Sequence, residues 1–168
     1  DHHSNPLKIA ISKFKRRGGR FISINPVRTG YSAIADEWVP IKPGTDGALM
    51  LAITHELIKQ GLYDRDFLVD YTNAAELINL NESSADYGMF IRTNKPVEEG
   101  CFDAQNKLWW DRSEDRPVTT HAPGADPFLL GSFTLEDGTP VKTAFQLLVE
   151  RLKKYTVEWA SDVTGIPA

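Results

Sequence analysis

The sequence predicts an α/β fold, built as a three-layer sandwich that is incomplete at its N-terminal edge, and two patterns lead to this prediction. The apolar run from Arg20 to Asn25 ends on a polar residue, which is typical of a strand buried in a parallel sheet. Helical periodicity precedes this run from Asn5 to Arg17 and returns from Asp46 to Gln60. A helix, a Gly turn and a strand in this order form half of a right-handed βαβ unit, so the expected sheet is Rossmann-like.

The second strand is expected from Glu37 to Lys42, and a turn at Pro43-Gly44 follows it. Asp46 then stands where a helix N-cap belongs, directly before the apolar positions of the next helix. We expect Leu49, Ile53, Leu57 and Ile58 to lie on the buried side of this helix.

Three more helices are predicted, over Asp64 to Tyr71, Ala144 to Tyr155 and Glu158 to Val163. Asp64 has the residue type and position of an N-cap in the first of them. Phe67 and Leu68 of that helix are expected to pack inward.

Residues 81–142 interrupt these periodicities with scattered Gly, Pro, Asn and Asp, and we interpret them as a loop-rich insertion carrying short antiparallel hairpins. Met89–Arg92 is expected to pair with Lys107–Arg112, and Ser132–Leu135 with Pro140–Thr143. The chain is therefore predicted to be one domain, residues 1–168, from which the insertion can be removed without unfolding the rest.

The composition of the chain limits the number of domains and the kinds of partner and site that it can have. The 168 residues, 41% of them hydrophobic, suffice for one domain with a buried core. A net charge of −4 argues against nucleic acid as a partner. No apolar stretch approaches the roughly 20 residues of a membrane-spanning helix. Because the chain begins without Met, we expect a targeting segment upstream. Cys101 is the single cysteine, so we expect no disulfide and no thiolate metal cluster made by this chain alone. The sequence leaves open whether the compartment is cytoplasmic or periplasmic.

Polar residues follow both predicted parallel strands, at the edge where open α/β sheets bind nucleotides. Asn25, Arg28 and Thr29 follow the first strand, and Asp46 follows the second. Backbone amides and the Thr29 hydroxyl suit phosphate or ribose oxygens, Arg28 adds a cationic fork, and a carboxylate can accept the paired N–H groups of guanine. The pattern favours a nucleotide site, although strand-end polar residues also occur in ordinary α/β loops.

Short motifs run along the chain in the order Asn25-Pro26-Val27-Arg28-Thr29, Ala35-Asp36, Ile41 to Asp46, Gly61-Leu62-Tyr63-Asp64, Asp66-Phe67, Tyr155 to Trp159 and Thr164-Gly165-Ile166-Pro167. Together, in this order and spacing, they resemble the dimethyl sulfoxide reductase family of molybdopterin oxidoreductases. The resemblance implies that the chain is an excised cofactor-binding domain of a catalytic subunit that uses a molybdenum bis(molybdopterin guanine dinucleotide) cofactor.

The resemblance also implies which residues contact the guanosine end of one molybdopterin guanine dinucleotide. They are Asn25, Pro26, Val27, Arg28, Thr29, Gly44, Thr45 and Asp46. The metal ligand and an iron–sulfur cluster are implied on earlier segments, so no catalytic residue is assigned here and the isolated chain is expected to be inactive. The implied partners are the rest of the catalytic chain, electron-transfer subunits and a small substrate that undergoes two-electron redox or oxygen-atom transfer, such as nitrate, formate or a sulfur oxyanion.

Two other functions remain open from the residues alone. A stand-alone mononucleotide-binding α/β enzyme would use Asp46 or Asp36 as an acid or base, although the sequence has no GxGxxG motif and no P-loop. A non-enzymatic interaction module would use the predicted helix Asn5 to Arg17, which is rich in Lys and Arg, and the aromatic segment at Trp109-Trp110. These tryptophans could line a substrate funnel or form a small core of their own.

Overall fold

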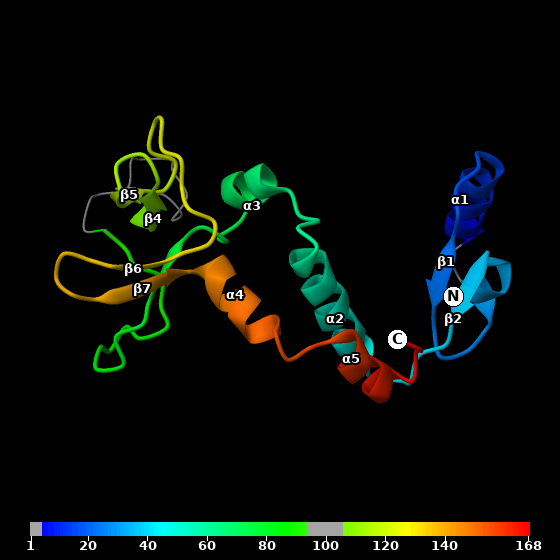
Figure 1. Ribbon diagram of the computed structural model, residues 1–168. Coiled ribbons are helices and arrows are strands. Elements are labelled where there is room, and N and C mark those ends of the chain that lie inside the picture. The colour runs from blue at the N-terminus through cyan, green and yellow to red at the C-terminus, as the bar shows by residue number, and fades with distance from the viewer. Residues whose placement is uncertain (1–4, 94–105) are drawn as a thin grey trace. The chain divides into compact units, whose positions relative to one another are not determined.

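The computed structural model describes residues 5–93 and 106–168, which form an α/β fold as the sequence predicts (Figure 1). The chain divides into two compact units. Unit 1 comprises Asp1–Gln60 and Leu152–Ala168, and unit 2 comprises Gly61–Arg151. Cys101 lies outside the described residues. Within the described ranges, no helix has the length and apolar character needed to cross a membrane.

Unit 1 contains a pair of parallel strands. Its elements are α1 (Asn5–Arg16), β1 (Ile22–Ile24), the 3₁₀ helix η1 (Gly30–Ile34), β2 (Glu37–Val39), α2 (Asp46–Lys59) and α5 (Val157–Thr164). β1 pairs with β2 in parallel, with Ile22 opposite Glu37 and Ile24 opposite Val39. The helices begin and end close to their predicted bounds, whereas both strands are shorter than predicted.

The prediction that β1 is a buried strand is wrong for the described residues. Ile22 and Ile24 are 47% and 44% exposed, whereas Ser23 between them is buried. Ser23 faces η1, where its hydroxyl oxygen lies 2.7 Å from that of Ser32. Because side chains alternate along a strand, covering Ser23 leaves both isoleucines on the opposite, open face. The three-layer sandwich remains a prediction, since the described strands form separate sheets of two, three and two strands.

α2 packs against α5, and each of the two helices buries an alanine, Ala52 in α2 and Ala160 in α5. Ile53 and Leu57, which were expected on the buried side of α2, are 40% and 43% exposed. The distance between packed helices depends on the side chains at the contact, so small buried residues favour close approach of α2 and α5.

Unit 2 is built from antiparallel strands. Its elements are α3 (Arg65–Tyr71), β3 (Leu77–Asn79), β4 (Leu108–Asp111), β5 (Arg116–Thr119), β6 (Ser132–Thr134), β7 (Pro140–Thr143) and α4 (Ala144–Leu152), whose last residue falls in unit 1. β7 lies between β3 and β6, which confirms the hairpin predicted for residues 132–143. The pairing predicted for residues 89–92 and 107–112 is wrong in its main part. A bridge joins Arg92 to Lys107, but β4 pairs with β5, because the short turn between them closes at low entropic cost.

α3 begins as predicted, because the Asp64 carboxylate accepts the backbone N–H of Phe67 at 2.9 Å. Phe67 itself does not pack inward as predicted. It is 55% exposed and stacks on Tyr71, with ring centroids 5.4 Å apart. These two residues are four positions apart and share one helix face, whereas the buried residue of α3, Val69, lies on another.

An aromatic core holds unit 2 together. Leu77, Trp110 and Val141 form a buried cluster, and the Phe133 ring stacks on Trp110 with centroids 4.5 Å apart. Trp109 is also buried, at 4% exposure. Both tryptophans are therefore core residues in this structure rather than an open funnel lining.

This core includes residues from inside and outside the predicted insertion. The N–H of Leu80 donates to the Pro140 carbonyl at 2.9 Å, so the ends of residues 81–142 lie side by side, as expected. However, Leu77 precedes this segment and packs on Trp110 within it. Removing residues 81–142 would take away Trp110 and most of β7, so from this packing we expect such a deletion to unfold unit 2.

Candidate functional site

The segment Asn25–Thr29 follows β1 directly, and its first residue is held in place by β2. The Asn25 N–H donates to the Val39 carbonyl at 3.1 Å, and the indole Nε1–H of Trp38 donates to the Asn25 carbonyl at 2.8 Å. The side-chain oxygen of Asn25 accepts the N–H of Val27 at 3.2 Å, which tightens the turn at Pro26. Both backbone polar groups of Asn25 are thus engaged.

The other end of this segment is also fixed. The Thr29 carbonyl accepts the Ser32 N–H at 3.0 Å, and the buried Ser32 hydroxyl meets that of Ser23 on β1. Pro26 to Thr29 are nevertheless exposed. Among the described residues, the Arg28 guanidinium has no recorded hydrogen-bond or ion-pair partner, so it is available to a ligand.

The second predicted segment, Gly44–Asp46, follows β2 and enters α2 through a tight turn. The Thr45 N–H and hydroxyl both donate to the Lys42 carbonyl, at 3.3 and 2.7 Å. Gly44 has φ of +78°, which a proline-glycine turn of this kind requires and which other residues adopt only with strain. The turn is anchored from the far end of the sequence, because the Lys42 N–H donates to the Thr164 carbonyl at 2.9 Å.

The prediction that Asp46 caps α2 is wrong. The N-cap is Thr45, whose hydroxyl points back to Lys42 and leaves the helix without a side-chain cap, and Asp46 is the first helical residue. Among the described residues, no partner is recorded for the exposed Asp46 carboxylate or for the N–H groups of Asp46 and Gly47. This end of α2 therefore offers both free donors and a free acceptor.

The two segments are related through the strands that precede them. β1 and β2 are parallel and in register, with Ile24 opposite Val39 as the last pair. Asn25–Thr29 and the approach to Gly44–Asp46 therefore both leave the carboxyl edge of this two-stranded sheet. This is the edge at which open α/β sheets bind ligands.

Asp36, from the Ala35-Asp36 motif, has a different role. Its carboxylate accepts the N–H of Phe21 at 2.8 Å and pairs with the Lys15 ammonium at 2.9 Å. The backbone donor of Phe21, followed by Lys15, lowers the pKa of this carboxyl group below its ordinary value. Asp36 ties α1 and β1 together, which argues against its use as an acid or base.

Sequence reasoning did not identify Ser23, Ser32 or Trp38, which hold the first segment. Ser23 carried a usable signal, because a polar residue in the middle of an apolar strand requires a hydrogen-bond partner when it is buried. Trp38 carried none, because an aromatic residue in a strand ordinarily indicates packing.

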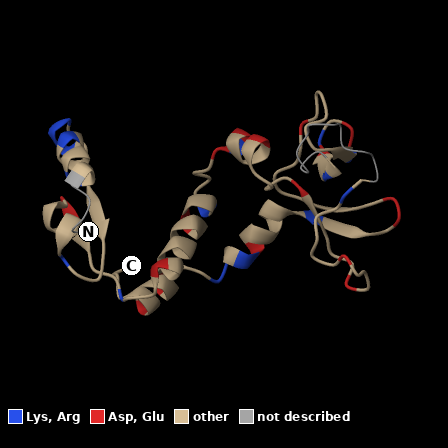
Figure 2. Ribbon diagram, turned by 180° about the vertical axis from the view of Figure 1, so that it is seen from behind, with Lys and Arg blue, Asp and Glu red and all other residues tan. Residues whose placement is uncertain are grey.

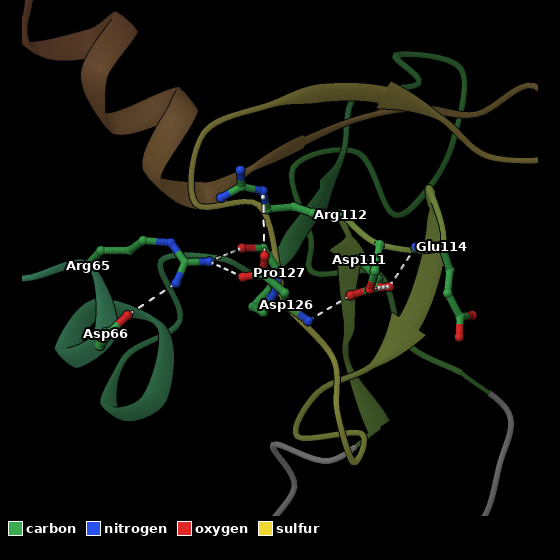
Figure 3. A network of polar contacts seen from close by, with 8 residues as sticks. Arg65, Asp66, Asp111, Arg112, Glu114, Asp126 and Pro127 are labelled. Atoms are coloured by element: carbon green, nitrogen blue, oxygen red, sulfur yellow. Dashed lines mark hydrogen bonds and ion pairs between the residues drawn. The ribbon is translucent and has the colours of Figure 1, made fainter.

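Unit 2 carries a separate polar network (Figure 3). The Asp126 carboxylate is held by Arg65 at 2.5 Å and lies 3.6 Å from Arg112. The buried Asp111 accepts hydrogen bonds from the Ser113 hydroxyl and from the N–H groups of Glu114 and Asp126, at 2.7, 2.9 and 2.7 Å. These donors, with the Ser113 hydroxyl first, lower the pKa of Asp111. Its oxygens are occupied by this chain, so the network supports the loop around β4 rather than a ligand. In the described parts of the chain, no three His, Cys, Asp or Glu side chains gather as a metal site would require.

Comparison with known proteins gives the family. The model of the molybdopterin oxidoreductase family matches residues 3–159. The chain is 70% identical over 168 residues to the A subunit of the sulfite dehydrogenase of Allochromatium vinosum, a match that covers 100% of this chain and 17% of that protein. It is 32% identical over 154 residues to the catalytic A subunit of a putative dimethyl sulfoxide reductase of Halobacterium salinarum (92% of this chain, 18% of that protein). It is also 30% identical over 193 residues to the alpha subunit of the perchlorate reductase of Dechloromonas aromatica (94% and 20%). The chain thus spans about a fifth or less of these relatives, and it belongs to the molybdopterin oxidoreductase family.

Proposed function

We propose that this chain binds the guanosine end of one molybdopterin guanine dinucleotide in a molybdenum oxidoreductase, through Asn25–Thr29 and Gly44–Asp46. Family membership implies a molybdenum–pterin cofactor, and the proposal adds its dinucleotide form and these contacts. The observation that carries the proposal is that two exposed segments, held at their ends, follow the carboxyl ends of paired parallel strands.

The charges around the first segment suit a polyanionic ligand. No Asp or Glu occurs between His2 and Ala35, whereas this stretch contains Lys8, Lys13, Lys15, Arg16, Arg17, Arg20 and Arg28. Figure 2 shows Lys and Arg gathered at the end of α1, whose last turn is basic. Lys15 and Arg20 are engaged by Asp36 and Glu37, which leaves Arg28 as the cation within the proposed site. A guanidinium can bind a phosphate through two parallel hydrogen bonds.

The second segment suits a guanine ring and a close backbone contact. The free Asp46 carboxylate can accept the adjacent N1–H and N2–H groups of guanine, a pairing that capping of α2 would have weakened. A Cβ atom added at Gly44 or Gly47 would meet nothing within 4 Å, so the space over this backbone is open to a ligand. The N–H groups at the start of α2 add donors and a favourable helix dipole for an anion.

When bound, the cofactor supplies the two-electron redox chemistry, and this chain binds and orients it. All three of these relatives are named as A or alpha subunits, which supports a catalytic chain that works with other subunits. The high identity to a sulfite dehydrogenase chain favours a sulfur oxyanion such as sulfite as the substrate of the whole enzyme. An iron–sulfur cluster and the metal ligand are proposed on parts of the enzyme outside this chain.

The proposal is tested by measuring the cofactor bound to the purified full-length enzyme. We expect Arg28→Ala and Asp46→Asn each to weaken cofactor binding about tenfold or more, because a hydrogen bond to a charged group contributes about 1.5–3 kcal/mol. The guanine nucleotide released by acid and the molybdenum content report the cofactor directly. Arg17→Ala removes an exposed cation outside both segments and serves as the matched control. If both site variants retained as much cofactor as Arg17→Ala, the proposal would be wrong.

A further inference from the structure

Trp38 has a polar contact that its position in a strand does not require. The side chain is partly buried, and its indole Nε1–H donates to the Asn25 carbonyl at 2.8 Å. Asn25 is the hinge between β1 and the exposed residues Pro26 to Thr29. A phenylalanine at position 38 could fill similar apolar space, but it could not hold this carbonyl.

The hydrogen bond from Trp38 fixes the direction of the Asn25 carbonyl. The Asn25 N–H is already fixed by Val39, as any continuing parallel ladder would fix it. The rotation of the following peptide is governed by where the Asn25 carbonyl points, and that direction decides how the chain enters Val27 and Arg28. Trp38 on β2 thus sets the path of residues 26–29, which follow β1 and lie earlier in the sequence.

We infer that Trp38 is a positioning residue for the proposed cofactor site: its indole N–H holds the loop that carries Arg28 and Thr29 in its binding conformation before the cofactor arrives. This inference rests on the proposed function. An exposed loop that is already ordered loses less conformational entropy on binding, so the benefit appears in cofactor affinity. Trp38 acts through Asn25, and it is assigned no contact with the cofactor.

The test uses the full-length enzyme with Trp38→Phe, Arg28→Ala and the double variant. Trp159→Phe is the matched control, because Trp159 is also partly buried in unit 1 and its described contacts include a ring contact with Tyr155 but no recorded hydrogen bond from its indole nitrogen. Two quantities are measured: the rate of cofactor release below the unfolding temperature, and hydrogen–deuterium exchange of the peptide containing residues 25–29 in cofactor-free enzyme.

Trp38→Phe is expected to speed cofactor release about 3- to 10-fold, the effect of one hydrogen bond, and to speed exchange in the 25–29 peptide. Trp159→Phe should change neither. The fold-increase in the rate of cofactor release in the double variant should be smaller than the product of the fold-increases in the two single variants, because both substitutions act through the same loop.

The possible outcomes distinguish the inference about Trp38 from the proposed function. If Arg28→Ala speeds release and Trp38→Phe does not, the inference is overturned and the proposed function stands. If neither variant changes release, both fail. If Trp38→Phe speeds release while exchange in the 25–29 peptide is unchanged and its effect multiplies fully with that of Arg28→Ala, Trp38 contributes general stability only and the inference is overturned.

Discussion

The ion pair between Glu76 and Lys107 gives the sharpest stability prediction for unit 2. The Lys107 ammonium lies 2.8 Å from the Glu76 carboxylate, and the two side chains are only 16% and 7% exposed. The ammonium also lies over the Phe90 ring, 4.7 Å from its centroid. Glu76 precedes β3 and Lys107 precedes β4, so this pair joins two of the sheets that surround the aromatic core.

Lys107→Met keeps most of the aliphatic stem but leaves the Glu76 carboxylate buried without its cation. Breaking a buried pair by removing one partner costs about 3–5 kcal/mol, and the residual exposure of Lys107 favours the lower end, about 3 kcal/mol. Urea unfolding of the 168-residue chain, followed by tryptophan fluorescence, measures this loss. Lys142→Met is the control, because the Lys142–Glu150 pair has the same 2.8 Å separation but side chains 27% and 34% exposed, and it should cost less than about 1 kcal/mol.

A second comparison isolates the buried charge. Glu76→Gln combined with Lys107→Met removes both charges and should recover a large part of the lost stability, since no uncompensated charge remains. Equal losses for Lys107→Met and Lys142→Met, or no recovery in the double variant, would refute the argument that burial determines the strength of this pair.

Two more predictions concern unit 1. Gly44→Ala should lower the stability of the chain by about 1 kcal/mol in thermal unfolding, because alanine is strained at φ of +78°. Gly47→Ala, in the first turn of α2, should instead raise the stability slightly. The lowered pKa of Asp36 means that its contacts with Phe21 and Lys15 stabilise the fold fully above its ordinary value of 3.8 and are lost as the pH falls through the lower, folded-state value. Asp36→Asn should therefore reduce the loss of unfolding free energy as the pH falls, which denaturant unfolding at a series of pH values measures. The same loss at low pH in the variant and the original chain would show that these contacts do not persist in solution.

Local signals in the sequence predicted the helices, the hairpin of β6 and β7 and the cap at Asp64, because each depends on residues close together in the chain. The exposure of Phe67 was not predictable in this way, since a short helix reveals which face is buried only once its neighbours are known. The same holds for Ile22 and Ile24, whose burial depends on what covers each face of β1.

The residues of the candidate site likewise divide into those that the sequence predicts and those that only the structure reveals. The motif residues from Asn25 to Asp46 could be chosen from the sequence, and their role in binding remains a proposal. The cap at Asp46 was predicted wrongly because Thr45, one residue earlier, is an equally suitable N-cap type, and its hydroxyl then bonds to Lys42 instead. The contact between Trp38 and Asn25 links residues thirteen apart through a parallel pair and has no local signature.

The hydrogen bond between Lys42 and Thr164 has a consequence for the order of folding. It joins the turn that precedes α2 to the last residue of α5, and all of unit 2 is synthesised between these two residues. On the ribosome, the Gly44–Asp46 turn therefore emerges long before the carbonyl that anchors it, so this contact has a high sequence separation and forms late. If the cofactor binds at the Gly44–Asp46 turn as we propose, its insertion into the finished turn would have to wait until unit 2 has been made.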